Sequence, residues 1–372
     1  MTDSTSSIVF MVSHSSPGGA QEIWANIAEG FSELGFSAKL CALYPFQGKM
    51  VEAPAKLPWT HIVPRRPTSI AGRMQLLAAL VRFFRKERPD FVLTAMPAAN
   101  VIVPLAAKLA GVKTRCVISH HTPVMTYNRL LNAADGIIGR LANVQTIVSV
   151  SDTVSRSLDG KSAGYRAKRR TIHNALPPRI EARLAALAST RKPASPRHKL
   201  VATGRLAAQK NYPVLIRAMA LLPDAIAYIV GSGPDEIELK ELAANLGVTD
   251  RMVFLGQLPR EETLSVLAGG DVFVQPSLFE GHSLALIEAA VLRLPLVVSS
   301  VPVQVEGVTS EDGQLCGIVV DPHDEVGLAN AIRSLLEDDA QYDSWTAKAG
   351  HLASTATFDR MMAAYGRVVG RE

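Results

Sequence analysis

Short apolar runs alternate with segments of helical periodicity along the first half of the chain. The apolar runs, which are expected to form strands, lie at 8–12, 37–43, 91–95, 114–119 and 146–150. The helical patterns begin at 21 and recur at 69–87, 99–110, 128–141 and 152–158. Because strand and helix alternate strictly, this half should form a parallel sheet with helices on both faces. Ligands should then bind beyond the carboxyl ends of the strands.

The second half repeats this alternation. Its expected strands lie at 200–203, 229–230, 251–255, 295–300 and 317–320, and its clearest helices lie at 212–222, 325–336 and 358–369. The pattern predicts an α/β protein with two doubly wound parallel-sheet domains, residues 1–175 and 195–357. Residues 190–199 contain two prolines and five basic residues, counting His198, and are expected to be exposed.

The stretch from Asp271 to Glu306 is expected to form one parallel crossover unit with a helix that opens at Gly281. Glu280 lies at the mouth of this helix and Glu288 follows eight residues later, so both carboxylates should lie near one face. Apolar residues surround Glu288, which indicates that its carboxylate is partly buried and needs a partner, such as sugar hydroxyls. The alternative is that Glu280 complements a helix N-terminus and that Glu288 is solvated.

Phe279-Glu280-Gly281 followed by Glu288-Ala289 resembles the F-E-G-x6-E-A motif of family 4, the glycosyl transferases group 1. Members of this family are retaining nucleotide-sugar glycosyltransferases with the GT-B fold. The resemblance implies two Rossmann-like domains that face a cleft, with the acceptor bound by residues 1–175 and the donor by residues 195–357. It also implies that the last helix, residues 358–372, crosses back to the first domain.

The same motif implies roles for individual residues. Glu280 would lie beside the donor sugar, and Glu288 would bind the ribose hydroxyls. The amides between them would meet the sugar and the phosphate, in the stretch Gly281, His282, Ser283 and Leu284. His282 and Ser283 stand where many relatives carry an apolar residue followed by Gly or Pro, so the sequence does not identify the donor.

Arg205 and Lys210 match the G-R-x4-K pattern of the family. An arginine fork and a lysine point charge five residues apart can converge on one pyrophosphate. The alternative is that both are surface cations. Gly231 and Gly233 lie in a glycine turn that borders the donor site in the family. This turn lacks the third glycine of a dinucleotide-binding fingerprint.

The first half contributes two further candidate segments. Gly18-Gly19 ends the loop after the first strand, where backbone amides can approach an anion, and the resemblance implies that this turn faces the donor phosphates. A tight turn that needs positive φ is the alternative. His120-His121 follow the strand 114–119, and neighbouring side chains on a strand point opposite ways. The resemblance implies that one histidine contacts the donor sugar and the reaction centre, and His121 fits better than His120.

The expected chemistry follows from the charges that develop when a sugar–diphosphate bond breaks. Arg205 and Lys210 would stabilise the negative charge on the leaving phosphate. Glu280 would orient the sugar near its positive anomeric carbon, and His121 would act there or at the acceptor. The chain contains no D-x-D triplet, so neither a metal ion nor another cofactor is expected.

Composition describes an ordinary globular protein, 48% hydrophobic and 20% charged. The first seventeen residues lack a basic segment, and no window holds eighteen uninterrupted apolar residues. We therefore expect neither a secretory signal nor a membrane-spanning helix, and a cytoplasmic location. Cys41, Cys116 and Cys316 lie far apart in apolar runs and are expected to be buried thiols.

The net charge of +5 conceals a split between the two halves. Residues 1–190 contain 23 Lys/Arg and 11 Asp/Glu, whereas residues 191–372 contain 16 and 23. Basic clusters lie at 65–66, 82–88 and 168–170. With Phe83 and Phe84 nearby, they predict peripheral contact with an anionic membrane on its cytoplasmic face. The alternative for the helix at 69–87 is an ordinary outer helix of the sheet. Nucleic acid is not expected as a partner, since aromatics are only 6% and no recognised module appears.

Together these features predict transfer of a hexose-type sugar from a UDP- or GDP-linked donor to a lipid-linked or glycan acceptor. The pathway would be synthesis of a cell-surface polysaccharide or glycolipid. Three alternatives remain open: a nucleotide-sugar epimerase or hydrolase on the same scaffold, a transferase with a soluble small-molecule acceptor, and a non-catalytic sugar-nucleotide sensor. The sequence does not fix the linkage or the oligomeric state.

Overall fold

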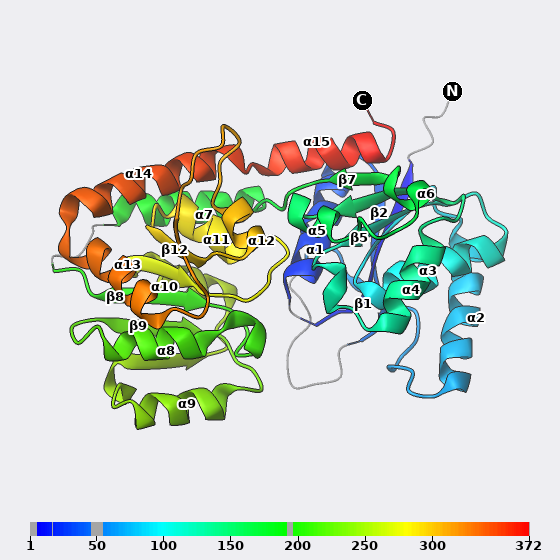
Figure 1. Cartoon of the computed structure of the whole chain (residues 1–372). Coiled ribbons are helices and arrows are strands. Elements are labelled where there is room, and N and C mark those ends of the chain that lie inside the picture. The colour runs from blue at the N-terminus through cyan, green and yellow to red at the C-terminus, as the bar shows by residue number, and fades with distance from the viewer. Residues whose placement is uncertain (1–5, 17, 46–54, 192–195, 372) are drawn as a thin grey trace. The chain divides into compact units, whose positions relative to one another are not determined.

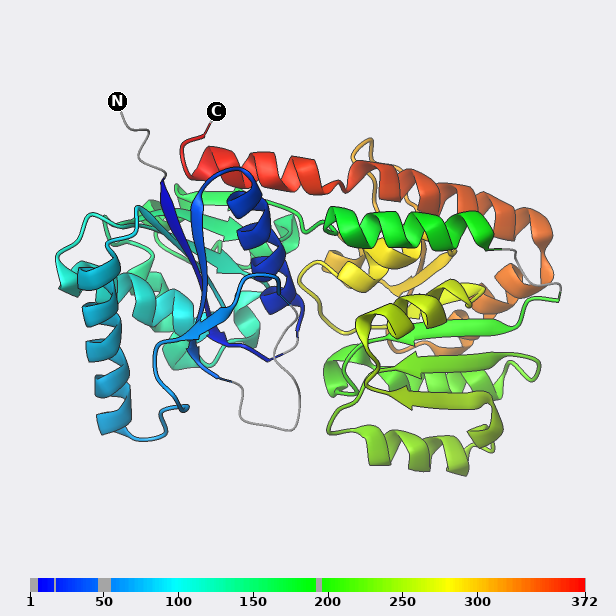
Figure 2. The same ribbon diagram turned by 180° about the vertical axis from the view of Figure 1, so that it is seen from behind.

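The computed structural model describes residues 6–16, 18–45, 55–191 and 196–371. It divides into two compact units, residues 1–173 with 359–372 and residues 174–358. Figure 1 and Figure 2 show the chain from opposite sides, and in each unit helices cover both faces of a sheet. This arrangement confirms the predicted α/β fold class with two parallel sheets.

Within the described residues, the first unit is built on a seven-stranded parallel sheet of order β3-β2-β1-β4-β5-β6-β7. The strands are β1 (Ser7–His14), β2 (Ser37–Tyr44), β3 (Trp59–His61), β4 (Phe91–Ala95), β5 (Arg115–His120), β6 (Val144–Ser149) and β7 (Arg169–Thr171). The order reverses between β1 and β4, which makes this position a topological switch point.

Side chains of β1 alternate between two apolar layers. On one face, Phe10 packs against Trp24 and Phe31 of α1. On the other face, Val9 and Met11 join a core shared with α2, α3 and α4. The helices of this unit are α1 (Gly19–Glu33), α2 (Ile70–Glu87), α3 (Pro97–Ala110), α4 (Arg129–Ile138), α5 (Asp152–Arg156), α6 (Ala163–Arg166) and α15 (Phe358–Val368). Period-two alternation along the strands therefore defines both cores.

Helix α15 follows the whole second unit in sequence but belongs to the first. Its Tyr365 is buried, and the phenol ring packs edge-on against Trp24 with ring centroids 6.1 Å apart. Met361 and Met362 of the same helix are also buried. The first unit is thus completed by the C-terminal end of the chain.

Helix α2 presents a different apolar surface from the one predicted. Phe84 is fully buried in the core, and Phe83 packs edge-on against it and is partly buried. The prediction that both phenylalanines enter a membrane interface is therefore wrong for Phe84, which the core encloses, and stays a prediction for Phe83, which is partly exposed. The exposed apolar residues of α2 are instead Ile70 and Met74, in its first two turns.

His120 lies at the end of β5 in a buried hydrogen-bonded network. Its Nδ1 and Nε2 lie 3.0 and 2.9 Å from the hydroxyls of Tyr127 and Tyr165. The Tyr165 hydroxyl donates to Oδ2 of Asp135 at 2.9 Å, and Nζ of Lys161 lies 3.0 Å from the same oxygen. Burial raises the pKa of both tyrosines. Burial also opposes ionisation of Asp135, but hydrogen bonds and positive charge from His120 and Lys161 lower its pKa.

The second unit contains, in its described part, a six-stranded parallel sheet of order β10-β9-β8-β11-β12-β13. The strands are β8 (Lys199–Thr203), β9 (Ile226–Val230), β10 (Met252–Gly256), β11 (Val272–Gln275), β12 (Leu296–Ser299) and β13 (Ile318–Val320). The helices are α7 (Pro178–Thr190), α8 (Tyr212–Ala220), α9 (Glu236–Asn245), α10 (Arg260–Ala268), α11 (Leu284–Val291), α12 (Pro302–Gly307), α13 (Glu325–Glu337) and α14 (Asp339–Thr355). The order reverses between β8 and β11, so a second switch point lies there.

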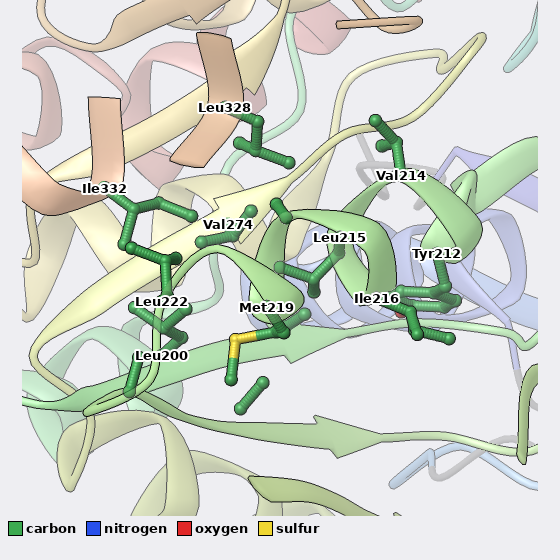
Figure 3. Packing of buried hydrophobic residues seen from close by; sticks show 14 of the residues in the cluster. Leu200, Tyr212, Val214, Leu215, Ile216, Met219, Leu222, Val274, Leu328 and Ile332 are labelled. Atoms are coloured by element: carbon green, nitrogen blue, oxygen red, sulfur yellow. The ribbon is translucent and has the colours of Figure 1, made fainter. Parts of the chain in front are cut away.

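Two apolar cores lie on opposite faces of this sheet. Leu200 and Val274 face the layer formed by α8, α9 and α13, and Figure 3 shows them in one cluster with Leu215 and Met219 of α8. Phe273, next to Val274 in β11, faces the layer formed by α7, α10, α11 and α14. The alternation fixes which way each strand turns its side chains at the carboxyl edge of the sheet.

The segment 190–199, expected to be exposed, carries two arginines that are half-buried; residues 192–195 lie outside the described part. Arg191 donates to the hydroxyl of Tyr342 at 2.8 Å. Arg197 stacks on the same ring and binds Asp339 at 2.5 Å. These contacts hold α14 against the sheet, so the prediction of an exposed linker was wrong for both arginines.

The three cysteines behave as predicted. Cys41, Cys116 and Cys316 are free and buried. Burial raises the pKa of Cys41 and Cys116 to about 12, so both stay protonated at neutral pH.

Gly136 of α4 and Gly139, the C-cap residue that follows this helix, provide a test of the network around His120. A Cβ at Gly139 would lie 2.3 Å from the buried ring of Tyr165, whereas a Cβ at Gly136 would make only ordinary contact with Lys161 at 3.5 Å. We expect Gly139→Ala to lower the free energy of unfolding by about 1–3 kcal/mol through overpacking. Gly136→Ala should raise it by about 0.5–1 kcal/mol through helix propensity. Urea unfolding followed by circular dichroism measures both, and equal midpoints for the two variants would contradict this packing.

Candidate active site

The loops that follow β8 and β11 meet at the switch point of the second sheet. The loop after β8 carries Arg205 and Lys210, and the loop after β11 carries Glu280. Because β8 and β11 are parallel neighbours, their carboxyl ends lie at the same edge. The predicted phosphate-binding and sugar-binding residues of this unit are thereby brought together.

Lys210 and Glu280 form the central ion pair of this edge. Nζ of Lys210 lies 2.7 Å from Oε1 of Glu280, and both side chains are largely buried, with exposed fractions of 14% and 10%. The hydroxyl of Ser277 donates to the same Oε1 at 2.9 Å, and Nε2 of Gln209 lies 3.4 Å from Oε2. The carboxylate is therefore desolvated, oriented and compensated before any ligand is bound.

Three glycines allow the neighbouring turns to approach each other. Gly204 has φ +144°, and a Cβ there would lie 2.5 Å from Cε of Lys210. A Cβ at Gly231, which has φ +145°, would lie 2.0 Å from the carbonyl oxygen of Gly204. At Gly233 it would lie 2.1 Å from the carbonyl oxygen of Leu206. Gly231 and Gly233 therefore have a packing reason to be glycine, and their donor-binding role stays a prediction.

Arg205 differs from Lys210 in being exposed. Its neighbour Leu206 is buried, and the amide of Leu206 donates to the carbonyl of Ser232 at 3.0 Å. The backbone on either side of the guanidinium is thus fixed while the side chain remains accessible to an anion. The structure places Arg205 on the same loop as Lys210, as the G-R-x4-K pattern predicts.

The loop that contains Glu280 is tied down by contacts that the sequence did not reveal. Gln209 accepts from the amide of Leu278 at 2.8 Å through its backbone carbonyl and donates to the carbonyl of Phe279 at 3.0 Å through its side chain. Asn174 donates to the carbonyl of His282 at 3.0 Å. The sequence offered one clue to Gln209, its position beside Lys210 in the motif. It did not reveal the hydrogen-bond partner, because Phe279 lies 70 residues away.

Asn211, on the other side of Lys210, also hydrogen-bonds to the backbone of neighbouring loops. It has φ +53°, and its side-chain amide donates to the carbonyls of Pro276 at 3.1 Å and Pro322 at 2.7 Å. One side chain thus joins the loops after β8, β11 and β13. Sequence reasoning missed Asn211 as well.

Helix α11 begins at Leu284, which corrects the predicted start at Gly281. Ser283 is the N-cap residue: its hydroxyl accepts from the amide of Leu286 at 3.4 Å and donates to Oε1 of Gln275 at 2.9 Å. Gly281 and His282 therefore belong to the loop. The reason is that the hydroxyl of Ser283 satisfies a free amide at the helix start, a cap that the apolar pattern alone did not locate.

This correction separates the two carboxylates that were expected to share a helix face. Glu280 lies in the loop, whereas Glu288 lies in α11 and is 1% exposed. The partner of Glu288 is Arg260, the first residue of α10, whose Nη2 lies 2.5 Å from Oε1 of Glu288. Burial of Glu288 was predicted correctly, but Arg260 was not identified as its partner.

In the first unit, the two adjacent histidines have different surroundings. His120 is enclosed by the tyrosine network described above, while His121 follows the strand end and is half-buried. Nε2 of His121 lies 3.2 Å from the hydroxyl of Ser119, and the imidazole packs edge-on against Trp24. Burial lowers the pKa of His121 to about 3, with a smaller contribution from His120, so the imidazole is neutral at physiological pH. His121 remains the candidate of the pair.

Gly18 and Gly19 lie at the start of α1 in the first unit. Gly18 has φ 171°, which is extended backbone, and Gly19 is the first helical residue. The alternative of a tight turn that needs positive φ is therefore wrong. A Cβ at Gly19 would meet nothing within 4 Å, and one at Gly18 would meet only the flexible end of Gln21. Binding of an anion by this turn stays a prediction.

Two family profiles match the chain, one in each unit. The family described as "Glycosyl transferases group 1" matches residues 189–351. The family described as "Glycosyltransferase Family 4" matches residues 17–179. Together the two matched ranges span most of the sequence.

Individual relatives agree with these families. The chain is 25% identical over 354 residues to the lipopolysaccharide core biosynthesis glycosyltransferase LpsE of Rhizobium meliloti, with 92% of each chain covered. It is 34% identical over 186 residues to a D-inositol 3-phosphate glycosyltransferase of Mycolicibacterium vanbaalenii. That alignment covers 45% of this chain and 40% of the relative, so it spans less than half the length of either protein.

Solved structures share the fold at low sequence identity. HepE of Anabaena in complex with UDP has a TM-score of 0.77 at 17% identity, with 97% of this chain and 99% of that chain covered. WaaG, a glycosyltransferase involved in lipopolysaccharide biosynthesis, has a TM-score of 0.73 at 15% identity, with 98% and 99% covered. The two profiles, the relatives and the paired parallel sheets agree: the chain belongs to the group 1, family 4 glycosyltransferases and has their GT-B fold.

Proposed function

We propose that this glycosyltransferase moves a hexose-type sugar from a UDP- or GDP-linked donor, with retention of anomeric configuration, to a lipid-linked or glycan acceptor. The pathway we propose is synthesis of a cell-surface polysaccharide or glycolipid. The observation that carries the proposal is the Lys210–Glu280 pair with the exposed Arg205 on the same loop. Two cations and one oriented carboxylate at a switch point match the charges of a nucleotide diphosphate sugar.

The cations would act on the leaving group. As the bond between sugar and diphosphate breaks, negative charge grows on the phosphate oxygens. Arg205 would bind these oxygens as a fork and Lys210 as a point charge, and amides near the start of α11 would add donors of hydrogen bonds. Lys210 would share its ammonium between the phosphate and Glu280, since one ammonium carries three donors.

The remaining polar groups would act on the sugars. Glu280 would accept hydrogen bonds from donor-sugar hydroxyls near the anomeric carbon, and Glu288 would accept them from the ribose. His121 would contact the donor sugar or the acceptor as a neutral imidazole, because burial holds its pKa to about 3. It would therefore exchange hydrogen bonds there and add no positive charge beside the forming oxocarbenium-like centre.

Names of relatives guide the choice of substrates to test. UDP and UDP-glucose are bound in structures of HepE, so UDP-glucose is the first donor to offer. LpsE is named for synthesis of the lipopolysaccharide core, which favours a lipid-linked acceptor. Incubation with donor alone distinguishes the alternative activity, because an isomerised sugar would indicate an epimerase.

The first test of the proposed function concerns the two cations. Arg205→Ala and Lys210→Ala should each lower turnover on the order of a hundredfold, because each stabilises charge that grows in the transition state. Arg205→Ala should leave thermal stability unchanged, whereas Lys210→Ala should also lower it, because a buried pair that loses one partner costs about 3–5 kcal/mol. Arg217→Ala, at an exposed position on α8, is the control. Near-wild-type turnover in both Arg205→Ala and Lys210→Ala would contradict the proposal that these residues bind the phosphates of the donor.

A second prediction concerns metal ions. Because Arg205 and Lys210 supply the positive charge, we expect sugar transfer to persist in excess EDTA. Initial rates with and without the chelator measure this. Loss of transfer that Mg²⁺ or Mn²⁺ alone restores would show that the proposed role of the cations is incomplete.

Membrane contact is proposed through the first unit. Ile70 and Met74 are 81% and 60% exposed, and Arg82 and Lys86 are exposed farther along the same helix. This pairing of apolar and basic side chains suits the surface of an anionic leaflet.

The cluster at 168–170 contributes less than expected, because Lys168 donates to the carbonyls of Gly139 and Leu141 at 2.9 Å. Among the described helices, none is long and apolar enough to cross a membrane.

Co-sedimentation with vesicles tests this contact. Each basic residue near an anionic leaflet contributes about 1 kcal/mol, and salt screens it beyond roughly 8–10 Å. We therefore expect binding to anionic vesicles at low salt and less binding at high salt. Changing Arg82, Arg85 and Lys86 to Gln should weaken it strongly.

The control for this variant removes the same net charge from the second unit, by changing Arg217, Lys240 and Arg333 to Gln. It should retain vesicle binding. A protein that ignores anionic vesicles at low salt would make a soluble acceptor the better proposal.

A further inference from the structure

The ion pair between Arg260 and Glu288 has no role in the activity as derived so far. Nη2 of Arg260 lies 2.5 Å from Oε1 of Glu288. The carboxylate is almost enclosed, with an exposed side-chain fraction of 2%, whereas the arginine side chain is 25% exposed. The pair therefore reaches from the interior of α11 toward solvent at the start of α10.

Local stability does not account for this arginine. Arg260 is the first residue of α10, where the helix dipole disfavours a cation, and the next two residues are Glu261 and Glu262, which that position favours. A buried ion pair also adds little net stability compared with apolar residues of similar volume. The pair is thus better explained by what it does to the carboxylate than by a contribution to folding.

The contact constrains Glu288 in two ways. It holds one carboxylate oxygen, Oε1, and so restricts rotation of the carboxylate. Within the described part of the chain, Arg260 hydrogen-bonds to Oε1 of this carboxylate, which leaves Oε2 to accept from a ligand. The positive charge of Arg260 also offsets the negative charge of the buried Glu288 carboxylate, so that an anionic nucleotide can bind beside it.

We infer that Arg260 is a positioning residue for the nucleoside of the donor: it orients Glu288 so that Oε2 accepts a hydrogen bond from a ribose hydroxyl. This inference rests on the proposed function, because it assigns a partner to the carboxylate that would bind the ribose. It predicts that Arg260 determines how strongly the protein distinguishes ribose from deoxyribose.

The test is calorimetric binding of UDP, 2′-deoxy-UDP and 3′-deoxy-UDP to the whole chain and its variants. The wild-type protein should bind UDP at least tenfold more tightly than one of the deoxy analogues. Arg260→Gln should weaken UDP binding tenfold or more and reduce that discrimination to less than threefold. Arg260→Lys, which keeps the charge without the fork, should recover part of both. In an assay of sugar transfer, Arg260→Gln should raise the KM for the donor while kcat changes little.

Arg251→Gln is the matched control in the same unit. Arg251 donates from Nη1 to the carbonyls of Met219 at 2.9 Å and Leu222 at 2.6 Å, so its loss should lower the melting temperature without changing deoxyribose discrimination. Arg260→Gln that keeps both the affinity and the discrimination of wild type would overturn the inference and leave the proposed function intact. If Arg260→Gln does not fold, wild-type discrimination in Arg260→Lys overturns it instead. A wild-type protein that binds none of UDP, GDP and ADP overturns the proposed function, and the inference with it.

Discussion

A carboxylate removed from water must be matched by a positive charge, and at the carboxyl edge of the second sheet Lys210 meets that requirement for Glu280. The two residues are 70 positions apart in sequence but follow neighbouring parallel strands. Holding them 2.7 Å apart requires the loops after β8 and β11 to lie close together, and Gly204 leaves room for Lys210, since a Cβ there would lie 2.5 Å from Cε of the lysine. The desolvated pair thus sets where the two loops meet, and hydrogen bonds from Gln209 and Asn174 hold the loop around Glu280 in place.

The regular elements could be predicted because each strand of a parallel sheet, covered on both faces, is a short apolar run. β4 and α13 begin at the predicted residues. The three-residue edge strands β3 and β7 were not predicted, because their sequences, WTH and RRT, are not apolar runs, unlike the equally short β13. Helix α14 was not predicted either, since its exposed face breaks the apolar pattern and its contacts depend on Arg191 and Arg197.

Motif spacing predicted the main residues of the candidate site, but it did not predict the residues that support them. Arg205, Lys210 and Glu280 fall together, as the pattern implies, but their supports come from distant segments. Glu288 illustrates the difference, since its burial follows from the apolar residues around it, whereas its partner Arg260 lies 28 residues away on another helix. Charge counts have the same limit, because Lys168 and Lys161 are engaged in internal contacts that a sum over the sequence treats as available.

The return of α15 to the first unit affects how the chain can mature during synthesis. Trp24 is synthesised long before Tyr365, which packs against it, because the whole second unit lies between them in the sequence. Until then the surface that α15 covers is apolar and open, while the complete second unit can already fold. The nascent first unit is therefore the part of this protein that we expect molecular chaperones to shield, and a ribosome stalled before α15 should hold it unfinished.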